Sequence, residues 1–168
     1  MGTKISIIDW LRRYYNLPYT SDAFENVNNS LDFLCIWSIF EAKFLEHGYN
    51  SKKFSDQMIE LAEKYTPTFK EFDDTFIFFK NRYFVNNHFT DNFRNLGLKS
   101  KSKERVVSIL SSSLPIYKDK LEILFIVIYK FRCNLFHGSK DPLLWKDFDD
   151  VFYHINVFLM KFLDCFKI

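Results

Sequence analysis

Glycine and proline are scarce in this chain, with four of each among 168 residues. An all-β fold needs many tight turns, and these two residue types supply much of the turn conformation, so the composition disfavours an all-β architecture. Phenylalanine, tyrosine and tryptophan make up 20% of the sequence and provide ample material for a core. A chain of this length buries roughly 70% of its unfolded surface as one unit, so we predict a single domain over residues 1–168.

Cysteine is also rare, and its three copies, Cys35, Cys133 and Cys165, lie far apart with no C-x-x-C pair. This pattern argues against a disulfide framework and against a structural zinc site, and it fits a reducing cytoplasm. His88 and His154 add no set of ligands with metal-binding spacing. The chain has no glycine-rich loop that would hold a nucleotide triphosphate. We therefore predict neither a metal nor a cofactor.

Long apolar runs are missing as well. The longest, residues 123–129, is far shorter than the roughly 20 residues that a transmembrane helix needs. The chain also opens without the charged and apolar segments of a secretory signal. We predict a soluble, cytoplasmic protein with no membrane partner. The formal net charge is only +2, so any contact with nucleic acid must depend on a local cluster of charge.

Apolar residues recur at the three-and-four spacing of an α-helix through most of the chain, and strand-like alternation is scarce. We therefore predict an all-α helical bundle of about five to seven helices. Residues 86–102 lose this periodicity and are expected to form a loop. The expected helices cover 5–15, a long stretch from a cap at Ser21 or Asp22 to 46, 51–64, 69–83, 102–113, 117–136, and a last helix from Asp141-Pro142 almost to the end of the chain.

Two of these helices carry pronounced apolar stripes. In the helix over 69–83 the stripe is aromatic and must face either the core or another subunit: Phe69, Phe72, Phe76, Phe79 and Tyr83. In the last helix the stripe indicates one buried face: Leu144, Phe148, Val151, Ile155, Phe158 and Phe162.

A charge interrupts the apolar stripe of the helix over 117–136. Arg132 shares a helix face with five apolar residues, Leu121, Leu124, Phe125, Ile128 and Leu135. A buried guanidinium needs an anionic partner. That partner is either an internal carboxylate or a phosphate ligand, and the planar fork of arginine suits both. His137, five residues further on, adds a group that titrates near neutral pH.

A second charge is placed in the same way in the long helix before residue 46. Glu41 shares a face with Val27, Leu31, Leu34, Ser38 and Leu45, and there it interrupts another stripe. Both charges are explained together if the two helices pack side by side and Glu41 meets Arg132. Such a pair either fixes the register of the helices or takes part in function, and the nearby histidine favours function.

At this point the sequence resembles a known family. Residues Arg132-Cys133-Asn134-Leu135-Phe136-His137-Gly138 are similar to the R-x(4-6)-H signature of the HEPN superfamily of small helical proteins. This segment is closest in sequence to the members whose motif ends in Leu-Phe-His-Gly. Residues 37–42 are similar to a segment that carries an acidic residue, here Glu41, in several branches. The resemblance extends to the order of the surrounding helices and does not include the start of the chain.

The resemblance implies a metal-independent endoribonuclease. In such enzymes two chains pack symmetrically through the motif helices, and RNA is cut by attack of its own 2′-hydroxyl, which leaves a 2′,3′-cyclic phosphate and a 5′-hydroxyl. His137 would act as general base or acid, Arg132 would hold the phosphate, and Glu41 would orient the guanidinium. Asn134 would hydrogen-bond the phosphate or the histidine. The implied partners are RNA, a second copy of the chain, and an antitoxin or phage-defence protein, because many members are toxins or defence effectors.

The match to this family has two departures and one geometric difficulty. Many members carry a polar residue directly after the arginine, where this chain has Cys133. The branch regulated by nucleotidyltransferase antitoxins carries a tyrosine where this chain has Ser139, so such regulation is not supported. Residues five apart on an ideal helix point about 140° away from each other. Arg132 and His137 therefore converge only if the last turn unwinds or a partner chain supplies one of them.

Two alternatives stay open. One is a catalytically inactive HEPN module that binds RNA, a nucleotide or a partner protein, or only dimerises. The other is a purely structural helical protein in which the Arg132–Glu41 pair sets the register. A basic run, Lys99, Lys101, Lys103 and Arg105, is interpreted first as a solvated loop and second as a contact for RNA phosphates.

Overall fold

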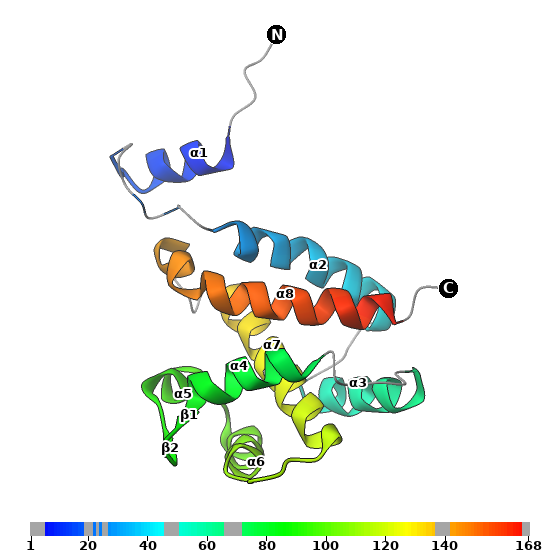
Figure 1. Ribbon diagram of the computed structural model, residues 1–168. Helices are drawn as coiled ribbons and strands as arrows, with labels where there is room; N and C mark the ends of the chain where they lie inside the picture. Colours follow the sequence, from blue (N-terminus) through cyan, green and yellow to red (C-terminus); the bar gives the residue numbers. More distant parts are fainter. Residues whose placement is uncertain are drawn as a thin grey trace.

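Helices account for most of the chain (Figure 1), as the periodicity of its apolar residues predicts. The structure is a computed structural model that describes residues 6–18, 22, 24, 27–45, 51–65, 72–136 and 142–165. The elements in these residues are α1 (Ile7–Tyr14), α2 (Asn28–Phe44), α3 (Ser51–Tyr65), α4 (Asp73–Tyr83), β1 (Phe84–Val85), β2 (His88–Phe89), α5 (Asp91–Asn95), α6 (Ser100–Leu110), α7 (Tyr117–Phe136), the 3-10 helix η2 (Pro142–Phe148) and α8 (Asp149–Asp164).

The centre of the fold is the pairing of α2 with α8, which lie side by side in Figure 1. Two side-chain hydrogen bonds link these helices near one end: Asn29 donates to Oδ2 of Asp149 at 2.8 Å, and Asn156 donates to the carbonyl of Asn29 at 2.8 Å. α7 lies below the pair in Figure 1, passes behind α4, and contacts α3, α4 and α6. α1 lies apart from the other helices, and none of its residues is buried.

Aromatic side chains fill the core where these helices meet. Phe125 of α7 contacts Phe158 and Phe162 of α8, with ring centroids 5.3 Å apart in both pairs. The aromatic stripe of α4 joins the same core, since Phe72, Phe76, Phe79 and Tyr83 are all buried. This stripe therefore faces the core and not another subunit; Phe69 lies outside the described residues.

The expected loop over 86–102 is wrong. The chain instead forms a β-hairpin, the short helix α5 and the start of α6. Asn86 and Asn87 have φ of 50° and 62°, the left-handed conformation that a two-residue hairpin turn requires and that asparagine tolerates. Thr90 then caps α5 by accepting a hydrogen bond from the N–H of Phe93. The basic run consequently begins a helix and is not a loop.

The starts of α2 and of the last helix also differ from expectation. α2 begins at Asn28, because Phe24 is buried and Asp22 forms an ion pair with Lys146 at 2.9 Å, so that tertiary contacts hold this segment outside the helix. Ser21 and Asp141 lie outside the described residues. After Pro142 the chain forms the 3-10 helix η2, and α8 begins only at Asp149. The predicted bounds of the helices over 5–15, 51–64 and 117–136 agree closely with α1, α3 and α7.

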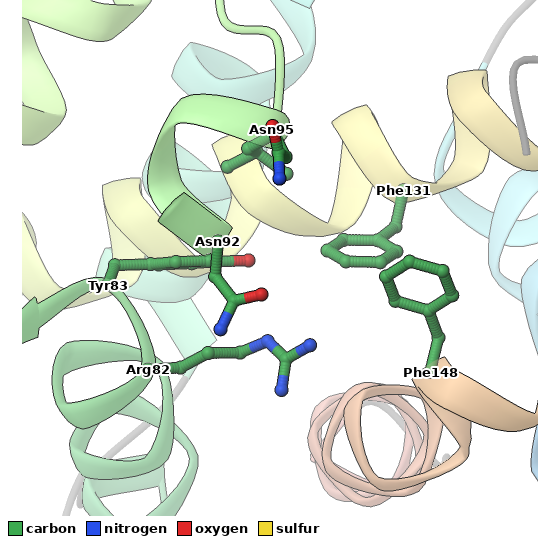
Figure 2. Close-up of a pocket in the computed structure, with 7 residues that line it drawn as sticks. Arg82, Tyr83, Asn92, Asn95, Phe131 and Phe148 are labelled. Carbon is green, nitrogen blue, oxygen red and sulfur yellow. The ribbon is translucent and has the colours of Figure 1, made fainter. Parts of the chain in front are cut away.

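A small cavity of about 80 Å³ lies between α4, α5, α7 and η2. Figure 2 shows the Tyr83 hydroxyl and the Asn92 side chain pointing into the space that Phe131 and Phe148 close from the other side. The Tyr83 hydroxyl is buried and has no hydrogen-bond partner among the described residues. Burial raises the pKa of Tyr83 above its ordinary value.

Candidate functional site

The apolar stripe of α7 is buried as predicted, and Arg132 is its one charged member. Leu121, Leu124, Phe125 and Ile128 are at most 1% exposed, whereas the Arg132 side chain keeps 21% of its surface accessible. The guanidinium therefore sits at the edge of the core and not within it. A charge in this place keeps contact with solvent, or with a ligand that comes from solvent.

Glu41 of α2 meets Arg132, as its position in the sequence predicts. Nη2 of Arg132 donates to Oε1 of Glu41 at 3.1 Å, and the Glu41 side chain is 34% exposed. The bond uses one guanidinium nitrogen and so is not the two-pronged pairing of which arginine is capable. Nε of Arg132 is buried without a hydrogen-bond partner among the described residues. Glu41 thus leaves part of the guanidinium's donor capacity unused.

Two aromatic rings fix the position of this guanidinium. Its central carbon lies 5.8 Å from the centroid of the Trp37 ring and 4.9 Å from that of Phe136, both within the range of cation–π attraction. Trp37 is fully buried, whereas Phe136 is about half exposed. One ring therefore anchors the cation to the core, and the other flanks it at the surface.

The predicted buried face of α2 is wrong. The buried residues of this helix are Ser30, Phe33, Trp37 and Phe40, whereas Ser38 of the predicted stripe is exposed. Both sets have helical spacing, and the larger aromatic side chains gain more from burial, so they determine which face turns inward. Glu41 follows Phe40 and stands beside the buried face. This placement explains its partial exposure.

Of the other predicted site residues, Asn134 is not brought to the Arg132–Glu41 pair. Asn134 is buried at 6% exposure, and two residues along an ideal helix turn it about 200° away from Arg132. Cys133 is partly buried on a third side of α7, where it lines a groove. His137 follows α7 in the sequence and lies outside the described residues.

That groove is a feature that sequence reasoning missed. It has a volume of about 280 Å³ and lies between α3, α7 and the segment that leads into α6. We call it the α6 groove; it is lined by Ser55, Gly97, Leu98, Lys99, Ser102, Ile126, Tyr129, Lys130 and Cys133. Burial and the neighbouring Cys133 sulfur raise the pKa of Tyr129. The serine-interleaved basic run was the only signal of this groove in the sequence.

The described part of the chain lacks several other classes of site. No cluster of histidine, cysteine or carboxylate side chains there has the geometry to hold a metal ion. None of its helices has the length and apolar character to cross a membrane. All three cysteines are free thiols, with Cys35 and Cys165 exposed. Comparisons with known proteins give no match to a family model, a curated protein or a solved structure.

Proposed function

We propose that the protein is a metal-independent endoribonuclease of the HEPN type, which acts as the toxin of a toxin–antitoxin pair or as a phage-defence effector. The observation that carries the proposal is the position of Arg132. This residue lies near the end of α7, is only 21% exposed, and forms an ion pair with Glu41 of α2. In the sequence, His137 follows this arginine at the spacing of the family signature. The fold is mostly helical, as that family requires.

The proposed reaction is an internal transfer of the phosphodiester. His137 as general base removes the proton of the 2′-hydroxyl, and the 2′-oxygen attacks the adjacent phosphorus. The bond from phosphorus to the 5′-oxygen breaks, and that oxygen takes up a proton from a general acid. A positioned acid or base contributes roughly 10²–10⁴-fold to such a reaction. The products are a 2′,3′-cyclic phosphate and a 5′-hydroxyl.

Arg132 would stabilise the charge that builds up on the phosphate oxygens. A guanidinium carries five N–H donors, and Glu41 takes a hydrogen bond from one nitrogen, Nη2. The carboxylate and the flanking rings restrict rotation of the guanidinium before substrate arrives, so little reorganisation is needed during the reaction. Glu41 is in this scheme a positioning residue, since it acts through Arg132.

A homodimer that packs through the motif helices completes the proposal. Arg132 faces α2 from a regular helix, and an ideal helix continued to position 137 would turn that residue about 140° away. A second copy related by two-fold symmetry would bring the histidine of one chain toward the arginine of the other. Asn134, which is buried away from Arg132, then belongs to the site only if the partner chain or a changed helix end exposes it.

The deciding experiment is cleavage of RNA by the purified protein in excess EDTA. We expect cleavage products whose 5′ ends accept phosphate directly from polynucleotide kinase. Arg132→Ala and His137→Ala should each reduce the rate by about 10²-fold or more. Matched controls are Arg94→Ala and His88→Ala, because both residues are exposed and belong to α5 and the hairpin, not to the helices that carry Arg132 and Glu41.

Undiminished cleavage by Arg132→Ala or His137→Ala would remove the site assignment. Circular dichroism of each variant shows whether a loss of activity is a loss of fold. If the unmodified protein cuts no RNA but binds RNA, a nucleotide or a protein through Arg132, the catalytically inactive alternative replaces the proposal.

A further inference from the structure

The first turn of α6 forms one wall of the α6 groove and carries uncompensated positive charge. α6 begins after Lys99, whose φ of −74° and ψ of 157° are typical of a residue that precedes a helix. No side chain caps this end, and its first turn contains no acidic residue. The free N–H groups and the helix dipole therefore favour an anion at this place.

Ser55 supplies an independent sign of a ligand on the opposite wall. This residue of α3 is 7% exposed and lines the groove. Its hydroxyl forms no hydrogen bond with any residue in the described part of the chain. The Ser55 hydroxyl thus lines the groove without a partner in the described protein, and a ligand oxygen in the groove would supply one.

Lysines concentrate further charge at the same end. The Lys130 side chain lies against Gly97: its Cε and Nζ are 3.6 and 3.7 Å from where a Cβ of residue 97 would stand. Lys99 and Lys130 form no ion pair with any described residue. An anion bound in the groove would be attracted by both ammonium groups and by the helix end.

The carboxylates nearest to the groove lie outside its lining. No residue that lines the α6 groove is acidic. An adjoining hollow shares Ser55, Lys99, Ser102 and Ile126 with the groove and includes Asp56 and Glu122. Glu122, however, is bound by Arg105 at 2.8 Å. Arg105 also pairs with Asp119, so this cluster holds two carboxylates and one guanidinium, and Asp56 lies in the hollow outside the groove. The charged side chains that line the groove itself, Lys99 and Lys130, are both positive.

The remaining wall of the groove is apolar. Leu98, Ile126 and Tyr129 are partly exposed there and would be covered by the apolar or aromatic part of a ligand. The volume of about 280 Å³ is close to the lower end of the range for small-molecule sites, about 300 Å³. An inorganic anion alone would leave this wall unused, whereas a nucleotide would use both the charge and the apolar surface.

We propose that the α6 groove binds one nucleotide of an RNA strand, with its phosphate at the first turn of α6 between Lys99 and Lys130 and its nucleoside over Ile126 and Tyr129. The groove includes Cys133, the residue that follows Arg132 in α7, so the same helix carries both the groove and the arginine. The inference rests on the proposed function only for the choice of RNA as the source of the nucleotide.

The test measures binding of a short, fluorescently labelled single-stranded RNA by anisotropy, in a His137→Ala background so that cleavage cannot interfere. We expect Lys99→Ala with Lys130→Ala to weaken binding by about tenfold and to lower the salt dependence of log Kd by about 0.7 for each phosphate that the protein no longer neutralises. Lys103→Ala is the matched control, because Lys103 lies on the same helix, is exposed and does not line the groove. The RNA affinity of the Lys103→Ala protein should change less than about twofold.

A second variant distinguishes a loss of RNA binding from a loss of folding. Ser102→Glu places a carboxylate in the first turn of α6, where a helix gains stability from an acid and a bound phosphate is repelled. We expect this variant to fold at least as stably as the parent and to lose RNA affinity by about tenfold or more. Unchanged affinity in Ser102→Glu, or an equal loss in Lys103→Ala, would overturn the inference.

Competition experiments distinguish the sources of the phosphate. AMP should displace the RNA, and inorganic phosphate should do so much less well. If phosphate competes as well as AMP, the apolar wall has no role and the nucleotide assignment is wrong. If AMP binding depends on Ser102 while RNA binding does not, the groove serves a free nucleotide and the RNA assignment is wrong.

Failure of this inference and failure of the proposed function give different results. A protein that binds RNA through the α6 groove but never cleaves it would contradict only the proposed function. Cleavage whose rate does not change in the groove variants would contradict only this inference.

Discussion

At the scale of single residues, the ion pair of Arg132 and Glu41 has both structural and chemical consequences. Each charge is partly withdrawn from water, with 21% and 34% of the side-chain surface exposed. Removing one partner leaves the other charge beside Trp37 and Phe136 without compensation. Replacing both residues by apolar ones leaves no uncompensated charge, and apolar packing takes the place of the ion pair. Stability and activity therefore respond differently to the single and the double substitution.

We expect Arg132→Leu and Glu41→Leu to lower the free energy of unfolding by about 1–2 kcal/mol each, less than the 3–5 kcal/mol of fully buried pairs, since solvent screens the partly exposed charges. The double variant should return to within about 1 kcal/mol of the unmodified protein. Urea denaturation of the four proteins measures this. A double variant that is stable and also cleaves RNA normally would show that the pair only sets helix register.

At the scale of elements, the hairpin of β1 and β2 depends on two asparagines with left-handed backbone conformations. The turn places Phe84 opposite Phe89, whose rings are 4.8 Å apart, and Phe89 in turn contacts Phe93 of α5 at 4.6 Å. The conformation of residues 86 and 87 thus fixes how α4 is joined to α5. A residue that resists positive φ in this turn would disturb both helices.

Asn87→Gly should leave stability unchanged or raise it slightly, because glycine adopts the φ of 62° without steric cost. Asn87→Val should lower the free energy of unfolding by about 1–2 kcal/mol, because a β-branched side chain resists the left-handed conformation that asparagine tolerates. Thermal denaturation followed by circular dichroism measures both. Asn92→Gly in α5 is the control and should destabilise, since glycine weakens a helix. The same sign of effect for glycine at positions 87 and 92 would contradict this account of the turn.

At the scale of the whole molecule, the proposed dimer predicts complementation between inactive chains. Suppose that Arg132 of one chain acts with His137 of the other. Random mixing of the Arg132→Ala and His137→Ala proteins then makes about half of the dimers mixed, each with one of two sites intact, and restores about a quarter of the full activity. The rate of RNA cleavage after the two inactive proteins are mixed, unfolded and refolded together measures this. If both residues act within one chain, the mixture stays inactive.

Helix positions and the ion pair could be predicted from the sequence because both depend on local periodicity. The stripe of α7 and the odd placement of Arg132 and Glu41 within their helices are visible without coordinates, and their contact follows from them. The buried face of α2 was misassigned because two overlapping sets of residues share helical spacing. The start of α2 was missed because burial of Phe24 and the Asp22–Lys146 pair depend on distant parts of the chain.

The α6 groove could not be predicted for a related reason. Its charge comes from Lys99 and Lys130, which are far apart in the sequence and line the same groove. Gly97, with φ of +69°, lies against the Lys130 side chain and brings this segment close to α7. Arg105 belongs to the same basic run but is neutralised by Asp119 and Glu122. Arg105 therefore has acidic partners, whereas Lys99 and Lys130 form no ion pair with a described residue, and this difference depends on the fold.

The ring of Trp37 beneath the Arg132 guanidinium gives the protein a built-in optical probe. An indole buried 5.8 Å from a positive charge emits at a wavelength that depends on the local electric field, and an anion that neutralises this charge alters that field. Trp10 is about half exposed, and Trp145 lies in η2, so neither shares this environment. Intrinsic fluorescence of the unlabelled chain therefore reports directly on occupancy beside Arg132.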